Sequence, residues 1–240
     1  MRYGVFADVH GNLEAWEVVA RALSEERIDR YICVGDIVGY GADPEECING
    51  VRSLGPIVVG GNHDWAAVGK TDISYFNPYA REAVLWTQAK LDQEDKDYLS
   101  SLGLIEGVED FTVVHGTLDE PQEFKYIQDI GSALSSFELL KRSILFVGHS
   151  HVPFILAKDE EIEYISSSEA KLSSGKKYVV NVGSVGQPRD GDPRACYAIY
   201  DSKAKMLEIK RLEYDIKTAQ AKIIDAGLPR ILAERLSVGR

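Results

Sequence analysis

All five histidines of this 240-residue chain lie in short polar motifs that follow runs of apolar residues. Together with Gly35-Asp36, the motifs are Asp8-Val9-His10, Gly60-Gly61-Asn62-His63-Asp64, His115-Gly116 and Gly148-His149-Ser150-His151. A short apolar run that ends at Gly or Asp is typical of a buried strand ending in a loop. Open α/β sheets bind their ligands at the loops after the carboxyl ends of strands. The pattern therefore predicts a sheet with one polar edge, where imidazole, carboxylate and amide groups converge.

The order of apolar periodicities predicts an α/β fold. Strands are expected at residues 2–7, 31–34 and 56–59, separated by helices at 11–25 and 43–54, which indicates parallel pairing with helical crossovers. Further strands are expected at 110–114 and 143–147, with a helix carrying Leu134, Phe137 and Leu140 between them. After His151 the pattern becomes antiparallel, with a hairpin over 152–165 and strands at 177–181, 195–200 and 206–212. The Ser- and Lys-rich segment 166–177 is expected to be a solvated loop.

The length suits one domain spanning residues 1–240. Residues 65–105 interrupt the strand–helix alternation and are expected to form a helical insertion that overhangs the polar edge. Its aromatic residues Tyr75, Phe76 and Tyr79 would either stack on a nucleotide base or pack against helices. Helical patterns over 215–237 close the chain and would either mediate self-association into a homo-oligomer or pack onto the protein's own sheet.

The charge and the cysteines limit the class of protein. A formal net charge of −11 disfavours nonspecific binding to nucleic acid or to an anionic membrane. This net charge does not exclude an anionic substrate, because bound cations can reverse the sign of the charge in one pocket. Three widely spaced cysteines make a disulfide framework improbable, and the chain enters a strand directly after Met1 and contains no run of membrane-spanning length. These features predict a cytoplasmic protein.

The donors at the predicted polar edge suit metal binding. Mixed imidazole and carboxylate ligation is accepted by Mn²⁺, Fe²⁺ and Zn²⁺, with Mn²⁺ the ion expected to serve in vitro. The number of donors exceeds the needs of one ion and suits two ions that share a carboxylate, roughly 3.5–4 Å apart, as in sites that clamp a displacement at phosphorus. The i, i+2 spacing in two motifs predicts that alternate side chains point the same way. The seven candidate ligands are Asp8, His10, Asp36, Asn62, His115, His149 and His151.

The series of motifs resembles the calcineurin-like metallophosphoesterases, and the stretch Asn181-Val182-Gly183-Ser184-Val185-Gly186-Gln187-Pro188-Arg189 resembles their small prokaryotic branch. The resemblance implies a four-layer α/β/β/α sandwich and a phosphoester hydrolase that uses a metal-bridging hydroxide as nucleophile. It implies that one metal binds Asp8, His10 and His151, the other binds Asn62, His115 and His149, and Asp36 bridges them. By the same resemblance His63 is the general acid, and Asp64 orients it as a carboxylate orients a catalytic imidazole.

The substrate is less constrained. Serine/threonine phosphatases of this superfamily carry Glu where this chain has Asp64, and further arginine motifs that are not evident here. The resemblance thus favours a phosphodiesterase or a (di)nucleotide phosphohydrolase over a protein phosphatase-like phosphomonoesterase. A catalytically silent scaffold and a metal-storage module are the alternatives from other functional classes. Arg189 would either contact a substrate phosphate or pair with Asp190 or Asp192.

Overall fold

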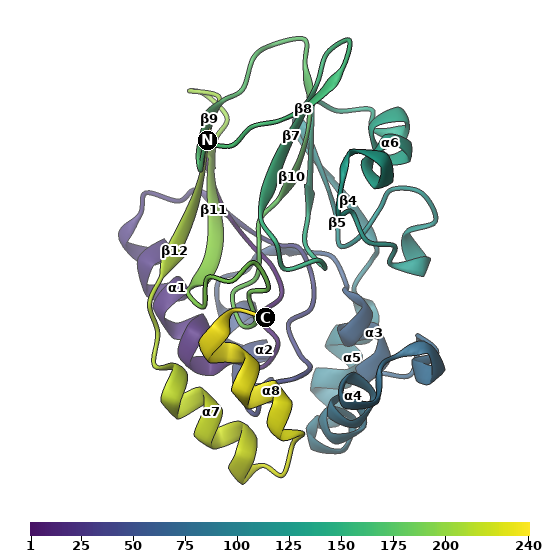
Figure 1. Ribbon diagram of the computed structural model, residues 1–240, viewed down its shortest axis with the longest axis vertical. Coiled ribbons are helices and arrows are strands. Elements are labelled where there is room, and N and C mark those ends of the chain that lie inside the picture. The colour runs from purple at the N-terminus through teal and green to yellow at the C-terminus, as the bar shows by residue number, and fades with distance from the viewer.

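Two mixed six-stranded sheets form the centre of the protein, whose computed structural model describes residues 1–240 (Figure 1). The first sheet pairs the three N-terminal strands in parallel and continues into antiparallel strands from the C-terminal part of the chain. Its order is β3 (Ile57–Val58), β2 (Arg30–Cys33), β1 (Arg2–Phe6), β11 (Ala195–Asp201), β12 (Met206–Leu212) and β9 (Glu169–Lys171). The parallel crossovers expected from the sequence are therefore present.

The second sheet contains the middle of the chain. Its parallel centre consists of β5, β6 and β10, and antiparallel strands lie at both edges. The order is β4 (Ile105–Val108), β5 (Phe111–Val114), β6 (Ile144–Val147), β10 (Lys177–Asn181), β7 (Phe154–Lys158) and β8 (Ile162–Tyr164). The hairpin expected over 152–165 is formed by β7 and β8.

Helices cover the outer face of each sheet and complete a four-layer α/β/β/α sandwich. An apolar cluster including Phe6, Trp16, Val19 and Leu23 joins the first sheet to α1 (Leu13–Glu25), α2 (Pro44–Ser53) and α5 (Gln93–Ser101). A second cluster, centred on Phe137, joins the other sheet to α6 (Ile130–Leu139). The architecture confirms the layered fold that the sequence predicted.

The two sheets pack face to face through a continuous aromatic and β-branched core. Tyr3 of β1 meets the ring of Phe111 on β5 edge-on at 4.9 Å, and Phe111 meets Phe146 on β6 at 5.2 Å. All three rings are fully buried. Because the strand period is two, alternate residues such as Val5 and Ala7 enter this core, whereas Phe6 faces the helices. This packing fixes the strand ends from which the polar motifs emerge.

The segment predicted as a helical insertion contains α4 (Pro78–Lys90) and α5, and it is preceded by α3 (Asn62–Ala67), which begins inside the Gly-Asn-His-Asp motif. The C-terminal segment forms α7 (Ile216–Asp225), α8 (Arg230–Glu234) and a terminal 3₁₀ turn, Arg235–Val238. These helices share an apolar cluster with Tyr40 and α4, at the same end of the sheets as α3 (Figure 1). No helix combines the length and the apolarity needed to cross a lipid bilayer.

The structure differs from the sequence analysis at two strands. Residues 169–171, expected within a solvated loop, form β9, because the edge of β12 offers unpaired backbone groups to a third antiparallel strand. Strand β4, which the sequence did not suggest, is mostly exposed and pairs with β5 at a sheet edge, where little apolar periodicity is needed. Of the three apolar residues that marked the helix between β5 and β6, Phe137 and Leu140 are buried, and Leu134 is 46% exposed.

The core between the sheets should dominate stability. Phe146→Ala removes a buried ring that touches both sheets, and we expect it to lower the free energy of unfolding by about 3–5 kcal/mol. The matched control Leu134→Ala removes an exposed side chain and should change that free energy by less than about 0.5 kcal/mol. Urea denaturation followed by circular dichroism measures both; equal losses in the two variants would contradict the proposed core.

Candidate metal centre

The polar motifs do converge at the carboxyl ends of the strands, on an unusual backbone. Asp8, His10, Asp36, His149 and His151 all adopt left-handed conformations, with φ between 51° and 66°. This region is costly for residues with a Cβ and clusters at functional sites, where the surrounding structure compensates for the strain. The direction of each of these side chains is therefore set by a left-handed turn of the backbone and not by continuation of the strand.

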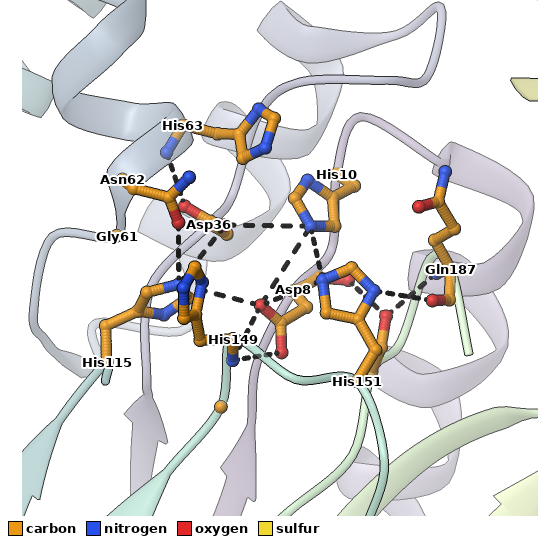
Figure 2. Close-up of polar contacts among 12 residues, drawn as sticks. Asp8, His10, Asp36, Gly61, Asn62, His63, His115, His149, His151 and Gln187 are labelled. Carbon is orange, nitrogen blue, oxygen red and sulfur yellow. Dashed lines mark hydrogen bonds and ion pairs between the residues drawn. The ribbon is translucent and has the colours of Figure 1, made fainter. Parts of the chain in front are cut away.

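The donors form two clusters. Asp8, His10 and His151 offer ligand atoms within 4.8 Å of one another, and Asp36, His115 and His149 do the same. The side chains of His149 and His151 therefore join different clusters, so the expectation that alternate residues point the same way is wrong for this pair. The His149 ring lies beside His115, and the His151 ring lies beside His10 (Figure 2).

The first cluster has the electronic arrangement of a cation site. His10 Nδ1 lies 3.0 Å from the carbonyl oxygen of Val38, and His151 Nδ1 lies 2.6 Å from that of Gln187. A carbonyl accepts a hydrogen bond, so each Nδ1 carries the proton, and each Nε2 of the neutral ring presents a lone pair. The two Nε2 atoms are only 3.0 Å apart, and His151 Nε2 is 3.5 Å from Asp8 Oδ1. Three electron-rich atoms aimed at one point fit a bound cation.

The second cluster contains an acceptor that the protein leaves free. Asp36 Oδ1 accepts a hydrogen bond from the backbone N–H of His63 at 2.8 Å, but its buried Oδ2 makes no hydrogen bond. That Oδ2 lies 3.2 Å from His115 Nε2 and 3.7 Å from His10 Nε2, so it stands between the two clusters. Asn62 Oδ1 approaches His115 Nε2 at 3.2 Å from the other side (Figure 2).

Burial keeps most of the imidazoles neutral. It lowers the pKa of His10, His149 and His151 well below the usual range, which leaves them in the form that binds metals. Burial also opposes protonation of His115, but the neighbouring Asp36 carboxylate outweighs it and raises the pKa of His115 to about 9. In the metal-free state, protonated His115 therefore supplies positive charge where the clusters meet.

The two buried carboxylates titrate in opposite directions. Burial raises the pKa of Asp8 to about 8, and the adjacent charge of Asp36 adds to this shift. Burial also disfavours ionised Asp36, but the positive charge of His115 outweighs it and holds the pKa of Asp36 well below its usual range. Two carboxylates in one dry site cannot both ionise freely without further positive charge.

Asp64 has a role that sequence reasoning misassigned. Its carboxylate accepts hydrogen bonds from the backbone N–H groups of Asp36, Ile37, Val38 and Gly61, at 2.8–3.2 Å. No hydrogen bond joins it to the His63 ring, so the expected carboxylate–imidazole contact is absent. Both Asp64 oxygens are saturated by backbone donors that would otherwise be buried without partners. Asp64 thus shapes the loop that carries Asp36.

His63 itself is buried among aromatic rings. Its ring centroid lies 4.4 Å from Tyr40, 4.9 Å from His10 and 5.3 Å from Phe76. Burial lowers the pKa of His63 to about 4, and its Nδ1 has no hydrogen-bond partner. His63 belongs to neither metal cluster but lies directly beside them, with a ring nitrogen free to interact with a ligand (Figure 2).

A stretch noted only for its resemblance, residues 181–189, supports the metal clusters. Asn181 Nδ2 donates to the carbonyl of Gly148 at 2.6 Å and to Ser150 Oγ at 3.0 Å, which fixes the loop between the two histidines. Ser184 Oγ donates to the carbonyl of Asp8, and the carbonyl of Gln187 accepts from His151. The sequence signal that could have indicated this support is the set of Asn, Ser and Gln residues directly after a strand. Buried amides and hydroxyls at such places commonly form hydrogen bonds to the backbone.

A cleft of about 860 Å³ opens from the centre. Asn62, His63 and His149 form its inner end, and the segment Lys70–Asn77 forms one wall, as expected of the insertion. Tyr75 is 91% exposed at this wall, whereas the ring of Phe76 packs against His63. The opposite wall carries Phe124 and Tyr126, and Tyr126 stacks on His149 with centroids 3.8 Å apart.

Comparison with known proteins agrees with this geometry. The family model described as the calcineurin-like phosphoesterase superfamily domain matches residues 1–205. The chain belongs to this superfamily. It is 40% identical to an uncharacterized protein of Methanocaldococcus jannaschii, with 98% of this chain and 97% of that protein covered. The crystal structure of a metallophosphoesterase from Sphaerobacter thermophilus is similar to it with a TM-score of 0.88 and 42% identity, over 100% of this chain and 99% of that one.

A hypothetical protein from Pyrococcus horikoshii OT3 has the same fold, with a TM-score of 0.82 at 20% identity and coverage of 100% of this chain and 98% of that one. The predicted resemblance is therefore confirmed over most of the chain. Family membership identifies phosphoester hydrolysis as the reaction, and the two donor clusters indicate a dinuclear centre for divalent ions.

The Asp64 carboxylate should be required for the shape of the centre. In Asp64→Asn an NH₂ group faces backbone N–H donors that the carboxylate now satisfies, so we expect a loss of about 2–5 kcal/mol in the free energy of unfolding. Misplacing Asp36 should weaken Mn²⁺ binding by about 10–100-fold. Urea denaturation and metal titration measure the two effects. Asp129→Asn, at the exposed N-cap of α6, is the control that should change neither.

Proposed function

We propose that this protein hydrolyses phosphodiesters or (di)nucleotides at a pair of divalent metal ions, with Mn²⁺ the ion to use in vitro. Asp8, His10 and His151 would hold one ion; Asn62, His115 and His149 would hold the other. Asp36 would bridge them through the oxygen that lacks a hydrogen bond. The ions, when bound, supply an activated water and neutralise charge on the phosphoryl oxygens. The carbonyl groups of Val34, Val38 and Gln187 hold three of the imidazoles in the tautomer this requires.

His63 is the proposed proton donor to the leaving group. It lies beside both clusters, at the inner end of the cleft, and its Nδ1 is not committed to another group. Its low pKa in the free protein means that the negative charge of a bound phosphoryl group would have to raise that pKa before His63 can donate a proton. The aromatic rings around it exclude water and fix its orientation.

The observation that carries the choice of substrate is the cleft. A phosphomonoester with a small alcohol group would need little room beyond the metal ions, whereas about 860 Å³ with aromatic walls suits a second ester substituent of nucleotide size. Trp65, Tyr75 and Phe124 offer the flat apolar surfaces on which a base stacks. A silent scaffold would have no need of a complete donor set opening into such a cleft.

The decisive test uses protein stripped of metal by chelation and reloaded with Mn²⁺, with bis-p-nitrophenyl phosphate and p-nitrophenyl phosphate compared in parallel. We expect turnover that depends on metal and a larger kcat/KM for the diester. Metal-dependent turnover confined to the monoester would replace our proposal with a phosphatase. Two bound ions without hydrolysis of any phosphoester would favour a metal-binding scaffold or storage module.

Replacing His63 should separate chemistry from metal binding. His63→Gln removes the proposed proton donor while leaving both donor clusters intact, so kcat for an alkyl diester should fall by about 10²–10⁴-fold. Metal content, measured by mass spectrometry of the purified variant, should stay at the wild-type level. The same variant should lose less activity on a diester with a p-nitrophenolate leaving group than on an alkyl diester, because p-nitrophenolate leaves without being protonated. Unchanged kcat on an alkyl diester would exclude His63 as the acid.

A further inference from the structure

Arg189 has no carboxylate partner. The two candidates considered from the sequence are engaged elsewhere, since Asp190 pairs with Arg211 and Asp192 pairs with Arg194. The Arg189 guanidinium instead lies 5.6 Å above the ring of Tyr40 and donates to the side-chain oxygen of Gln187 at 2.9 Å. Its Nε is buried and makes no hydrogen bond. A buried donor without a partner is costly unless a ligand uses it.

Arg189 is positioned over the metal centre. Its backbone N–H donates to the carbonyl of His151, and the Tyr40 ring beneath its guanidinium packs against His10 at 4.6 Å and His63 at 4.4 Å. A guanidinium at this place, bound to no acid, is oriented to meet an anion that reaches the centre.

A second arginine comes from the end of the chain. The C-terminal turn is seated on the loop after Arg189, because the backbone N–H of Gly191 donates to the carbonyl of Gly239 at 2.9 Å. Arg235 in this turn forms no ion pair; its Nε donates to the carbonyl of Arg240. Burial and the nearby positive charge of Arg189 lower the pKa of Arg235. Figure 1 shows the C-terminus close to the strand ends that carry the site.

We propose that Arg189 and Arg235 form an anion subsite beside the metal centre, which binds a second phosphoryl group of the substrate. The Tyr40 ring beneath the Arg189 guanidinium packs in one apolar cluster with Leu236, the residue after Arg235. The two arginines therefore come from adjoining segments, and an anion between them would offset their positive charge. This inference rests on the proposed function and narrows it to substrates with a second phosphate besides the one that reacts.

The first test is binding, measured by isothermal titration calorimetry on the full chain after chelation, with inorganic pyrophosphate as probe. We expect Arg235→Gln to weaken pyrophosphate binding by about tenfold, the loss of one charge-assisted contact. The control Arg230→Gln removes the same charge from the same segment, at a side chain that is 80% exposed and paired with Glu234, and should bind as wild type. Equal affinity of Arg235→Gln and Arg230→Gln would overturn the subsite.

The second test uses the Mn²⁺-loaded protein, with AMP and ADP as competitive inhibitors of diester hydrolysis. Wild type should prefer ADP, and the ratio of the two inhibition constants should fall by about tenfold in Arg235→Gln. Thermal unfolding of both variants checks that the C-terminal turn stays folded. If the loaded protein hydrolyses no diester but pyrophosphate binding still depends on Arg235, the proposed function fails and the subsite stands. If the loaded protein hydrolyses the diester but the ratio of inhibition constants is the same in wild type and Arg235→Gln, the proposed function is retained and the subsite is excluded.

Discussion

The burial of two carboxylates at the ends of neighbouring parallel strands is the constraint on which this structure depends. Asp8 and Asp36 are both 0% exposed, and isolated buried charge is strongly unfavourable. The fold compensates in layers: the backbone N–H of His149 donates to Asp8, that of His63 donates to Asp36, and His115 carries a proton beside them. What remains is an excess of acceptors that only cations can satisfy, so the stability of this edge and its chemistry have the same cause.

Backbone conformation is the second part of that arrangement. Left-handed turns direct the ligand side chains toward the metal centre. Each strained loop is fixed by a buried polar side chain from another segment. Asp64 binds the loop of Asp36, and Asn181 binds the loop between Gly148 and Ser150. Gly61 must be glycine because a Cβ there would lie 2.1 Å from Asp36 Oδ1. Groups that never touch a metal therefore determine where its ligands stand.

The apolar periodicity located the parallel crossovers, and the polar motifs at the strand ends located the residues of both donor clusters, because both signals are local. The four layers were implied by the family resemblance. Sequence reasoning failed where the cause is not local. Three of the four backbone donors to Asp64 lie 26 to 28 residues away on another loop, so their identity cannot be seen in the motif. The division of His149 and His151 between clusters cannot be read from their spacing, because Asp8 and His10 have the same spacing and share one cluster. Strands β4 and β9 exist because a neighbouring edge accepts them, and their own sequences are mostly exposed and weakly patterned.

The segment beyond the family match gives the centre its particular surroundings. Residues 206–240 lie outside the matched range, yet their helices pack on Tyr40, and Lys222 of α7 reaches both Glu14 and Asp43 at 2.5 and 3.0 Å. These ion pairs hold α7 against α1 and the start of α2, and the hydrogen bond from Gly191 N–H to Gly239 joins the C-terminal turn to the loop after Arg189. A shared family core can supply metals and a proton donor, whereas discrimination among phosphoesters needs groups that touch the part of the substrate that does not react. In this chain the groups proposed for that task come from the aromatic cleft and from the C-terminal turn. Substrate choice is therefore expected to vary with these two segments while the donor clusters stay the same.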